Sequence, residues 1–284
     1  MKFLYLLPLI LATFSLLANP DQQTLNSAES VVYKETDTRS LKLHLFKPEG
    51  WSVDQRRPAI VFFFGGGWNT RNLTQFVAFS RYYAGQGFVC FVADYRVRST
   101  DDTRVLDSVE DAQDAFAYVR EHAEEFGVDS DKIASAGGSA GGHLAAVLGT
   151  VKDLRNGDRS VPNAMILFNP VLVFDPKKSN KWYTKAEFVG AYPYALSPLH
   201  QIHDSVPPTI IYHGTADKTV SYASAERFHR AMVKAGQQST LIAFKDRGHG
   251  FFNGGKHLPD SDYQQTLEYT DGFLKGIDWL PFLQ

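Results

Sequence analysis

A serine flanked by glycines is the most chemically distinctive feature of the sequence. The stretch 137–141 reads G-G-S-A-G, which matches G-x-S-x-G; a short apolar run, 132–136, precedes it, and alanine and leucine at helical spacing follow. In this strand–turn–helix context a serine is held on a strained turn as a nucleophile. Gly137 and Gly141 remove side chains that would collide across such a turn. We therefore expect Ser139 to attack an acyl carbon.

Two polar residues later in the chain could complete this chemistry. Asp217 lies four residues after a strand predicted to end at His213, and His249 lies five residues after one predicted to end at Phe244. Because the carboxyl ends of parallel strands meet at one edge of a sheet, these residues can converge on Ser139. His249 would take the serine proton and return it to the leaving group, while Asp217 would hold the imidazole in the required tautomer.

Backbone N–H groups near the serine are candidates for an oxyanion hole, the site that stabilises the negative oxygen of a tetrahedral intermediate. Ala140 is the residue after the nucleophile and begins the predicted helix. Gly66 and Gly67 follow an apolar strand predicted at 58–64, and glycines there let the backbone approach a ligand closely. We expect the N–H of Ala140 and that of Gly66 or Gly67 to serve this role.

Other ionisable residues near these motifs have competing interpretations. Asp246 could be the acid, but it precedes His249 by only three residues, and so short a link makes the far edge of the imidazole hard to reach. We therefore prefer Asp217. His143 is expected to pack or hydrogen-bond beneath the pocket, and His213 is expected to be structural.

The elements that must position these residues follow from the hydrophobic pattern. Continuous apolar runs that alternate with helical patterns predict a mostly parallel sheet covered by helices on both faces, preceded by an antiparallel pair. The predicted strands are 31–33, 41–46, 58–64, 88–93, 132–136, 165–168, 209–213 and 240–244. The predicted helices are 76–84, 107–126, 140–148, 223–235 and 263–274.

The segment 175–207 breaks this alternation. It lacks clear periodicity and gathers aromatic residues and prolines, and a loop-rich insertion of this length is usually functional. We expect a small lid or wall of the substrate pocket, with Trp182, Tyr183 and the earlier Trp68 as substrate contacts. The alternative is that these aromatic residues only attach the insertion to the core.

Composition narrows the class of protein. The 284 residues are 44% hydrophobic and 21% charged, which suits one globular domain with a large core. The 29 basic and 31 acidic residues leave no general basic surface, so nucleic-acid binding is not expected. Cys90, the only cysteine, lies in an apolar run and is expected to be a buried thiol. No metal-ligand spacing occurs, and no metal or cofactor is expected.

Residues 1–18 have the pattern of a secretory signal peptide. A lysine precedes the uncharged apolar run 3–17, which is shorter than the roughly 20 residues that span a bilayer. We place cleavage after Ala18, although Leu16 is bulkier than usual at its position, and an uncleaved anchor is the alternative. The catalytic domain, 19–284, is then expected to be secreted or periplasmic, with no stable membrane association.

Five ordered motifs occur along the chain: F-G-G-G-W at 64–68, G-G-S-A-G-G-H-L-A at 137–145, S-P-L-H at 197–200, H-G-T-A-D-K-T-V at 213–220 and G-H-G-F at 248–251. Together they resemble the α/β-hydrolase superfamily, in which the triad follows the order serine, acid, histidine, as in this chain. The resemblance extends to hormone-sensitive-lipase-like esterases and to secreted acetyl or feruloyl esterases of plant polysaccharides. Phe64 stands where the former usually have histidine, and their helical cap has no counterpart here, which favours the carbohydrate esterases.

The resemblance implies an α/β-hydrolase fold and a serine carboxylesterase that works through an acyl-enzyme without a cofactor. Acetyl or feruloyl groups on plant polysaccharides are the expected substrates. A general lipase or esterase and a prolyl-peptidase-like hydrolase are the alternatives, although no large cap or extra domain is evident. A non-catalytic binding protein on the same fold is the alternative from another class. Such proteins characteristically lose a triad member or an elbow glycine, whereas this chain retains them all.

Overall fold

The computed structural model describes residues 20–153, 155–177, 181–254 and 260–280. The predicted signal peptide, residues 1–18, lies outside this part of the chain. Within the described ranges, no helix has the length and apolar character needed to cross a membrane.

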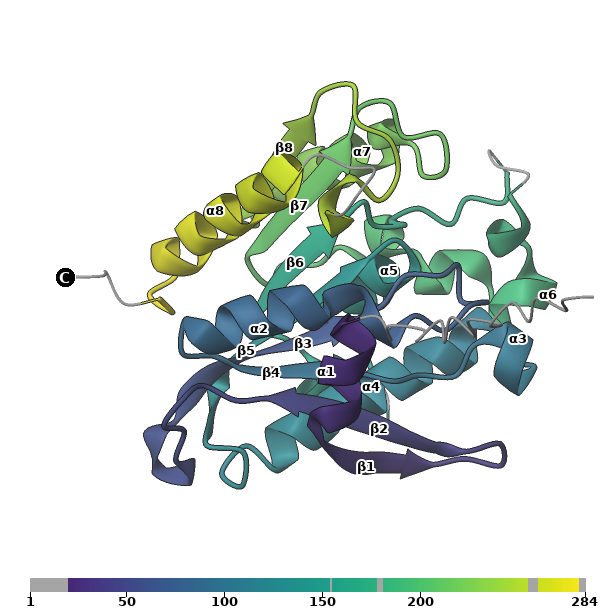
Figure 1. Cartoon of the computed structure of the whole chain (residues 1–284). Helices are drawn as coiled ribbons and strands as arrows, with labels where there is room; N and C mark the ends of the chain where they lie inside the picture. The colour runs from purple at the N-terminus through teal and green to yellow at the C-terminus, as the bar shows by residue number, and fades with distance from the viewer. Residues whose placement is uncertain (1–19, 154, 178–180, 255–259, 281–284) are drawn as a thin grey trace, which may run out of the picture.

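In the part of the chain that the structure describes, eight strands form one central sheet (Figure 1). They are β1 (Glu29–Glu35), β2 (Ser40–Phe46), β3 (Arg57–Phe63), β4 (Val89–Ala93), β5 (Val128–Gly138), β6 (Ala164–Phe168), β7 (Thr209–Gly214) and β8 (Ser239–Phe244). Their spatial order is β1-β2-β4-β3-β5-β6-β7-β8. The pairs β1–β2 and β2–β4 are antiparallel and the other pairs are parallel, which confirms the mostly parallel sheet with an opening antiparallel pair.

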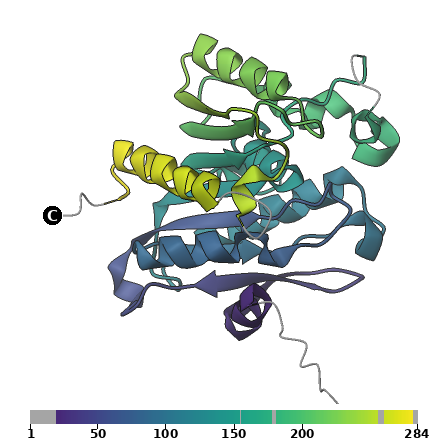
Figure 2. The ribbon, with the colours of Figure 1, turned by 45° about the horizontal axis from the view of Figure 1, so that its top comes forward.

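Helices cover both faces of this sheet (Figures 1 and 2). They are α1 (Pro20–Ser27), α2 (Val77–Gly85), α3 (Arg98–Asp101), α4 (Val105–Glu121), α5 (Ala140–Thr150), α6 (Ala186–Val189), α7 (Tyr222–Lys234) and α8 (Asp260–Gly276). On one face α2 lies beside α8, where Tyr82 donates a hydrogen bond to Asp271 at 2.6 Å. On the other face lie α4, α5 and α7. This arrangement confirms the predicted α/β-hydrolase architecture.

The inner strands show why the sheet forms. Every residue of β4, β6 and β7 is buried, as are the last five residues of β3, because each of these strands has helices on both faces. The β1 strand is different: it lies at the edge of the sheet and contains no fully buried residue. The continuous apolar runs in the sequence therefore mark the strands that carry the site.

Some elements differ from the prediction. The short helix α1 was not expected, since the first helix predicted from the sequence is 76–84. The helix predicted over 107–126 ends at Glu121, because the chain then turns toward Gly127, whose φ of 59° suits glycine. The insertion 175–207 is built from α6 and short 3-10 helices at Trp182–Thr184, Pro193–Leu196 and Pro198–Gln201.

Candidate active site

The nucleophile elbow lies between β5 and α5. Ser139 has φ 55° and ψ −115°, a conformation that L-residues rarely adopt. A Cβ on Gly137 would lie 2.3 Å from the Gly141 carbonyl oxygen, and one on Gly141 would lie 2.0 Å from the Phe63 carbonyl oxygen. Both positions therefore require glycine, as predicted. The Ser139 N–H donates to the Phe168 carbonyl at 2.9 Å, which attaches the turn to β6.

The structure brings Ser139, His249 and Asp217 together in one hydrogen-bonded chain. His249 Nε2 lies 3.0 Å from Ser139 Oγ, and His249 Nδ1 lies 2.7 Å from Asp217 Oδ2. With the proton on Nδ1 shared with the carboxylate, Nε2 is free to accept the serine proton. The Asp217 side chain is fully buried, whereas that of His249 is 25% exposed. The base is thus open to substrate and its acid partner is shielded from water.

Asp217 is held as a carboxylate despite its burial. Burial alone would raise its pKa, but the hydrogen bonds from His249 and from backbone N–H groups outweigh this effect and lower the pKa. The N–H groups of Thr219 and Val220 donate to Oδ1 at 2.8 and 2.9 Å. Asp217 therefore stays ionised at neutral pH.

Asp246, the rival candidate for the acid, does not take that role. It has φ 59°, and its backbone N–H donates to Thr215 Oγ1 at 2.8 Å. The carboxylate that contacts His249 belongs to Asp217. The preference for Asp217 from loop length agrees with this geometry.

Ala140 directly follows the nucleophile, and the loop that contains Gly66 and Gly67 comes close to it at Gly65. Ala140 begins α5, so its N–H has no acceptor within the helix. The glycine loop after β3 passes close to the serine, because a Cβ on Gly65 would lie 3.4 Å from Ser139 Cβ. The N–H of Gly65 donates to Gln75 Oε1 at 2.5 Å. Gly66 and Gly67 have φ of 138° and 62°, and these positive values favour glycine at both positions of this tight loop.

Comparison with known proteins identifies the family of this chain. A model of the BD-FAE family matches residues 43–232. The chain belongs to the BD-FAE family. Esterase 2 of Thermogutta terrifontis with propionate bound is 45% identical, with a TM-score of 0.86 over 92% of this chain and 98% of that one. The same esterase phosphorylated by paraoxon is 44% identical, with a TM-score of 0.84 over 91% and 97% of the two chains.

Two curated relatives are also named as esterases. An acetylxylan esterase of Xylanibacter ruminicola is 29% identical over 77% of this chain and 45% of its own length. The esterase LipC of Mycobacterium tuberculosis is 27% identical over 68% and 53%. The chain spans about half the length of these curated relatives. The predicted resemblance to α/β-hydrolases of the esterase class is confirmed.

Trp68, Trp182 and Tyr183 were predicted to contact substrate in this BD-FAE protein, and the structure separates them. Tyr183 is half-buried and lines a cavity next to Asp217. Trp68 is only 3% exposed and packs on His143 and Phe174, so it supports the site from below and does not face a ligand. The Trp182 side chain lies outside the described part of the structure.

His143 is buried under the elbow, as the sequence suggested. Its Nε2 lies 2.7 Å from the Leu196 carbonyl, and its ring stacks on Phe174 with centroids 4.6 Å apart. Complete burial lowers its pKa to about 4. The imidazole is therefore neutral at neutral pH, and it attaches the insertion to the elbow helix.

Acid should destabilise the protein through His143. Between pH 6.5 and about 4 the unfolded chain binds a proton on this residue that the folded chain excludes. The free energy of unfolding therefore decreases as the pH is lowered through this range. The expected slope is about 1.4 kcal/mol per pH unit. His143→Gln keeps a donor for Leu196 but does not titrate. Urea unfolding at several pH values should therefore show a smaller loss of unfolding free energy at low pH for this variant than for the parent protein. Equal slopes for the two proteins would contradict this assignment.

Asn169 is a site residue that the sequence analysis missed. It lies just after β6 with φ 33° and is 1% exposed. Its Oδ1 accepts the Gly250 N–H at 3.1 Å, and its own N–H donates to Tyr212 at 2.7 Å. Asn169 thereby connects β7 to the residue after His249. In the sequence, the Asn-Pro pair after a strand indicates a turn at this position, but it does not indicate a role in the site.

Removing this link should weaken catalysis more than binding. Asn169→Ala should lower kcat roughly 10- to 100-fold with little change in KM, because a freed loop misplaces the imidazole. Asn169→Asp keeps an acceptor for the Gly250 N–H, so it should recover most of the rate. Its pH–rate profile should also move upward, since a new negative charge favours the imidazolium. Steady-state kinetics on a p-nitrophenyl ester test this, and equal losses in both variants would exclude the positioning role.

Proposed function

We propose that this protein is an exported serine carboxylesterase that removes short acyl groups, acetyl or feruloyl, from plant polysaccharides. The observation that carries the proposal is the unbroken chain from Asp217 through His249 to Ser139, with contacts of 2.7 and 3.0 Å, beside the glycine loop after β3. This arrangement can activate a serine toward an ester carbonyl.

The reaction follows from the positions of these groups. Ser139 Oγ attacks the ester carbon while its proton passes to His249 Nε2, and Asp217 stabilises the imidazolium that forms. The negative oxygen receives the N–H of Ala140 and that of Gly66 or Gly67, each worth about 10²- to 10³-fold in kcat. The C–O bond to the alcohol breaks as His249 returns the proton to that oxygen. Water then attacks the acyl-enzyme with the same base and releases the acid.

The substrate class rests on the relatives and the N-terminal pattern. One relative is an acetylxylan esterase, and esterase 2 of Thermogutta terrifontis has been solved with propionate and with butyrate. These support short acyl groups. The signal-peptide pattern of residues 1–18 would bring the enzyme to polymers outside the cell or in the periplasm.

A series of p-nitrophenyl esters from acetate to octanoate tests the proposal. We expect kcat/KM to be highest for the shortest chains and to fall by about tenfold or more at octanoate. The Ser139→Ala protein is the blank for non-enzymatic release. Acetylated xylan and methyl ferulate then separate acetyl from feruloyl specificity. A rate that rises with chain length would identify a lipase instead.

A further inference from the structure

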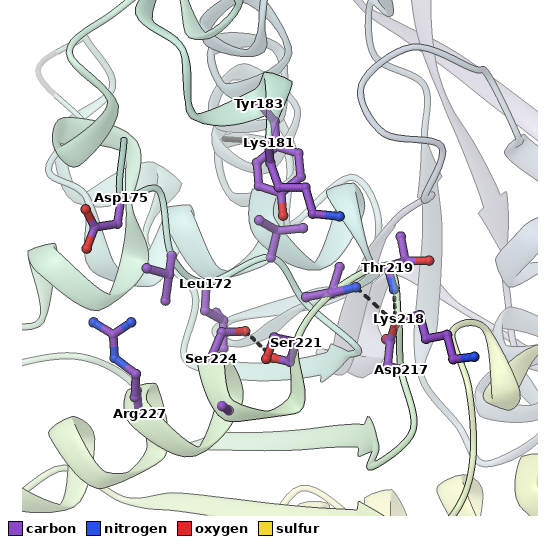
Figure 3. A pocket seen from close by; sticks show the side chains of 14 residues that line it. Leu172, Asp175, Lys181, Tyr183, Asp217, Lys218, Thr219, Ser221, Ser224 and Arg227 are labelled. Atoms are coloured by element: carbon purple, nitrogen blue, oxygen red, sulfur yellow. Dashed lines mark hydrogen bonds between the residues drawn. The ribbon is translucent and has the colours of Figure 1, made fainter. Parts of the chain in front are cut away.

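A cavity of about 320 Å³ lies beside the catalytic acid (Figure 3). Three segments form its walls: the chain after β6, the insertion, and the loop from β7 into α7. Its volume is at the lower end of small-ligand sites, which span about 300–1,000 Å³. Asp217 and Tyr183 line it, whereas Ser139 and His249 do not. The cavity is thus a neighbour of the reaction site and suits the part of a substrate beyond the ester.

The cavity lies close to the nucleophile. Only the imidazole of His249 and its two hydrogen bonds, of 3.0 and 2.7 Å, separate Ser139 Oγ from the carboxylate of Asp217, a residue that lines the cavity. The cavity therefore begins one side chain away from the reaction site, and we place the alcohol part of the substrate there.

The walls combine an aromatic ring, apolar side chains and hydroxyl groups. Tyr183 points its hydroxyl into the cavity from the insertion, and Leu172 lines the wall below it (Figure 3). Thr219, Ser221 and Ser224 supply hydroxyl groups, and Ser224 Oγ donates to the Ser221 carbonyl at 2.6 Å. Sugars suit such walls, because their C–H faces pack on aromatic rings while their hydroxyls hydrogen-bond.

Positive charge exceeds negative charge around this cavity. Its basic residues are Lys181, Lys218 and Arg227, and its acidic residues are Asp175 and Asp217. Arg227 rises from α7 into the cavity, and Lys218 lies at the rim beside Asp217 (Figure 3). In the described part of the chain, neither the Arg227 side chain nor that of Lys218 makes a hydrogen bond or an ion pair.

The two carboxylates already have donors. Asp217 accepts hydrogen bonds from His249 and from the N–H groups of Thr219 and Val220. Asp175 is 5% exposed, and its Oδ1 accepts from the Tyr194 hydroxyl at 2.8 Å and the Lys177 N–H at 3.2 Å. The guanidinium of Arg227 therefore remains available for an acceptor on a ligand.

We propose that this cavity binds a sugar unit that bears a carboxylate, with Arg227 as the main partner of that carboxylate. A guanidinium can bind a carboxylate through two parallel hydrogen bonds, and Lys218 adds a positive charge at the rim. The inference rests on the proposed function: the preferred substrate is an acylated acidic sugar, and its acyl group is transferred to Ser139.

Calorimetric titration of the protein with methyl glucuronoside and with the neutral methyl glucoside tests the cavity without catalysis. We expect the glucuronoside to bind roughly tenfold or more tightly, with an affinity that falls as salt is added. Arg227→Gln should remove this preference. Arg230→Gln is the matched control, since Arg230 is an exposed residue of the same helix that does not line the cavity, and it should keep the preference.

The outcomes separate this inference from the proposed function. A protein that binds the glucuronoside preferentially but cleaves no p-nitrophenyl ester would support the cavity and contradict the esterase. A protein that cleaves esters but binds both sugars equally would overturn the carboxylate site. Equal behaviour of Arg227→Gln and Arg230→Gln would overturn it too. On an acetylated glucuronoside, Arg227→Gln should raise KM about tenfold and leave kcat nearly unchanged.

Discussion

Replacing Ser139 with alanine should lower kcat by about 10⁴- to 10⁶-fold, the range expected when a triad nucleophile is lost. Alanine lacks the oxygen that forms the acyl-enzyme, and neither His249 nor the oxyanion hole can replace that bond. The fold should survive, because alanine is no larger than serine and the flanking glycines remain. Release of p-nitrophenol measures the rate, and thermal unfolding measures the fold.

Ser135 provides a matched control. It lies on β5, the strand that leads to Ser139, is fully buried, and donates from Oγ to the Ala145 carbonyl at 3.0 Å, away from the reaction. Ser135→Ala should keep its activity and lose about 1 kcal/mol of unfolding free energy. If Ser139→Ala turned over esters as fast as Ser135→Ala does, the nucleophile would lie elsewhere.

Asp217→Asn should lower kcat by about 10⁴-fold. The amide can place a donor where the carboxylate accepts the His249 Nδ1 proton, and the imidazole then carries its proton on Nε2. That tautomer cannot take the proton of Ser139. Substrate binding should change much less, so the loss should appear in kcat rather than in KM.

Asp246→Asn is the comparison for this variant. Asp246 carries the same charge and lies three residues from His249, but the hydrogen-bond partner of the imidazole is Asp217. Asp246→Asn should therefore stay within about twofold of the parent in kcat, as for most exposed surface changes. Similar losses in the two variants would mean that net charge near His249 matters, and not the single contact to Asp217.

The elbow could be predicted from the sequence because its determinants are local. A short apolar run, two glycines around a serine and a helical segment specify the turn within a few residues. The physical reason is steric: a Cβ on Gly137 would collide with the Gly141 carbonyl, and a Cβ on Gly141 would collide with a carbonyl of β3. The apolar runs of the inner strands were equally local signals, because burial on both faces demands them.

Other features depended on contacts between distant segments. In the sheet β4 lies between β2 and β3, an order that no single strand encodes. The pairing of His249 with Ser139 spans 110 positions and needs the loops after β5 and β8 to converge, although β6 and β7 lie between these strands. Spacing along the chain could rank Asp217 above Asp246, but only the converged loops show which carboxylate reaches the imidazole.

Side-chain environment was the least predictable property. Trp68 follows the glycine loop and was expected to face substrate, yet packing against His143 buries it. Nothing in the sequence distinguished Asn169, because its role depends on the hydrogen bond from Gly250, which is 81 positions away. The sequence by itself determined the elbow, the strands and the chemistry of the nucleophile. Tertiary structure decided which acid, which aromatic residue and which amide surround it, because burial and hydrogen bonding there depend on segments that meet only in the folded chain.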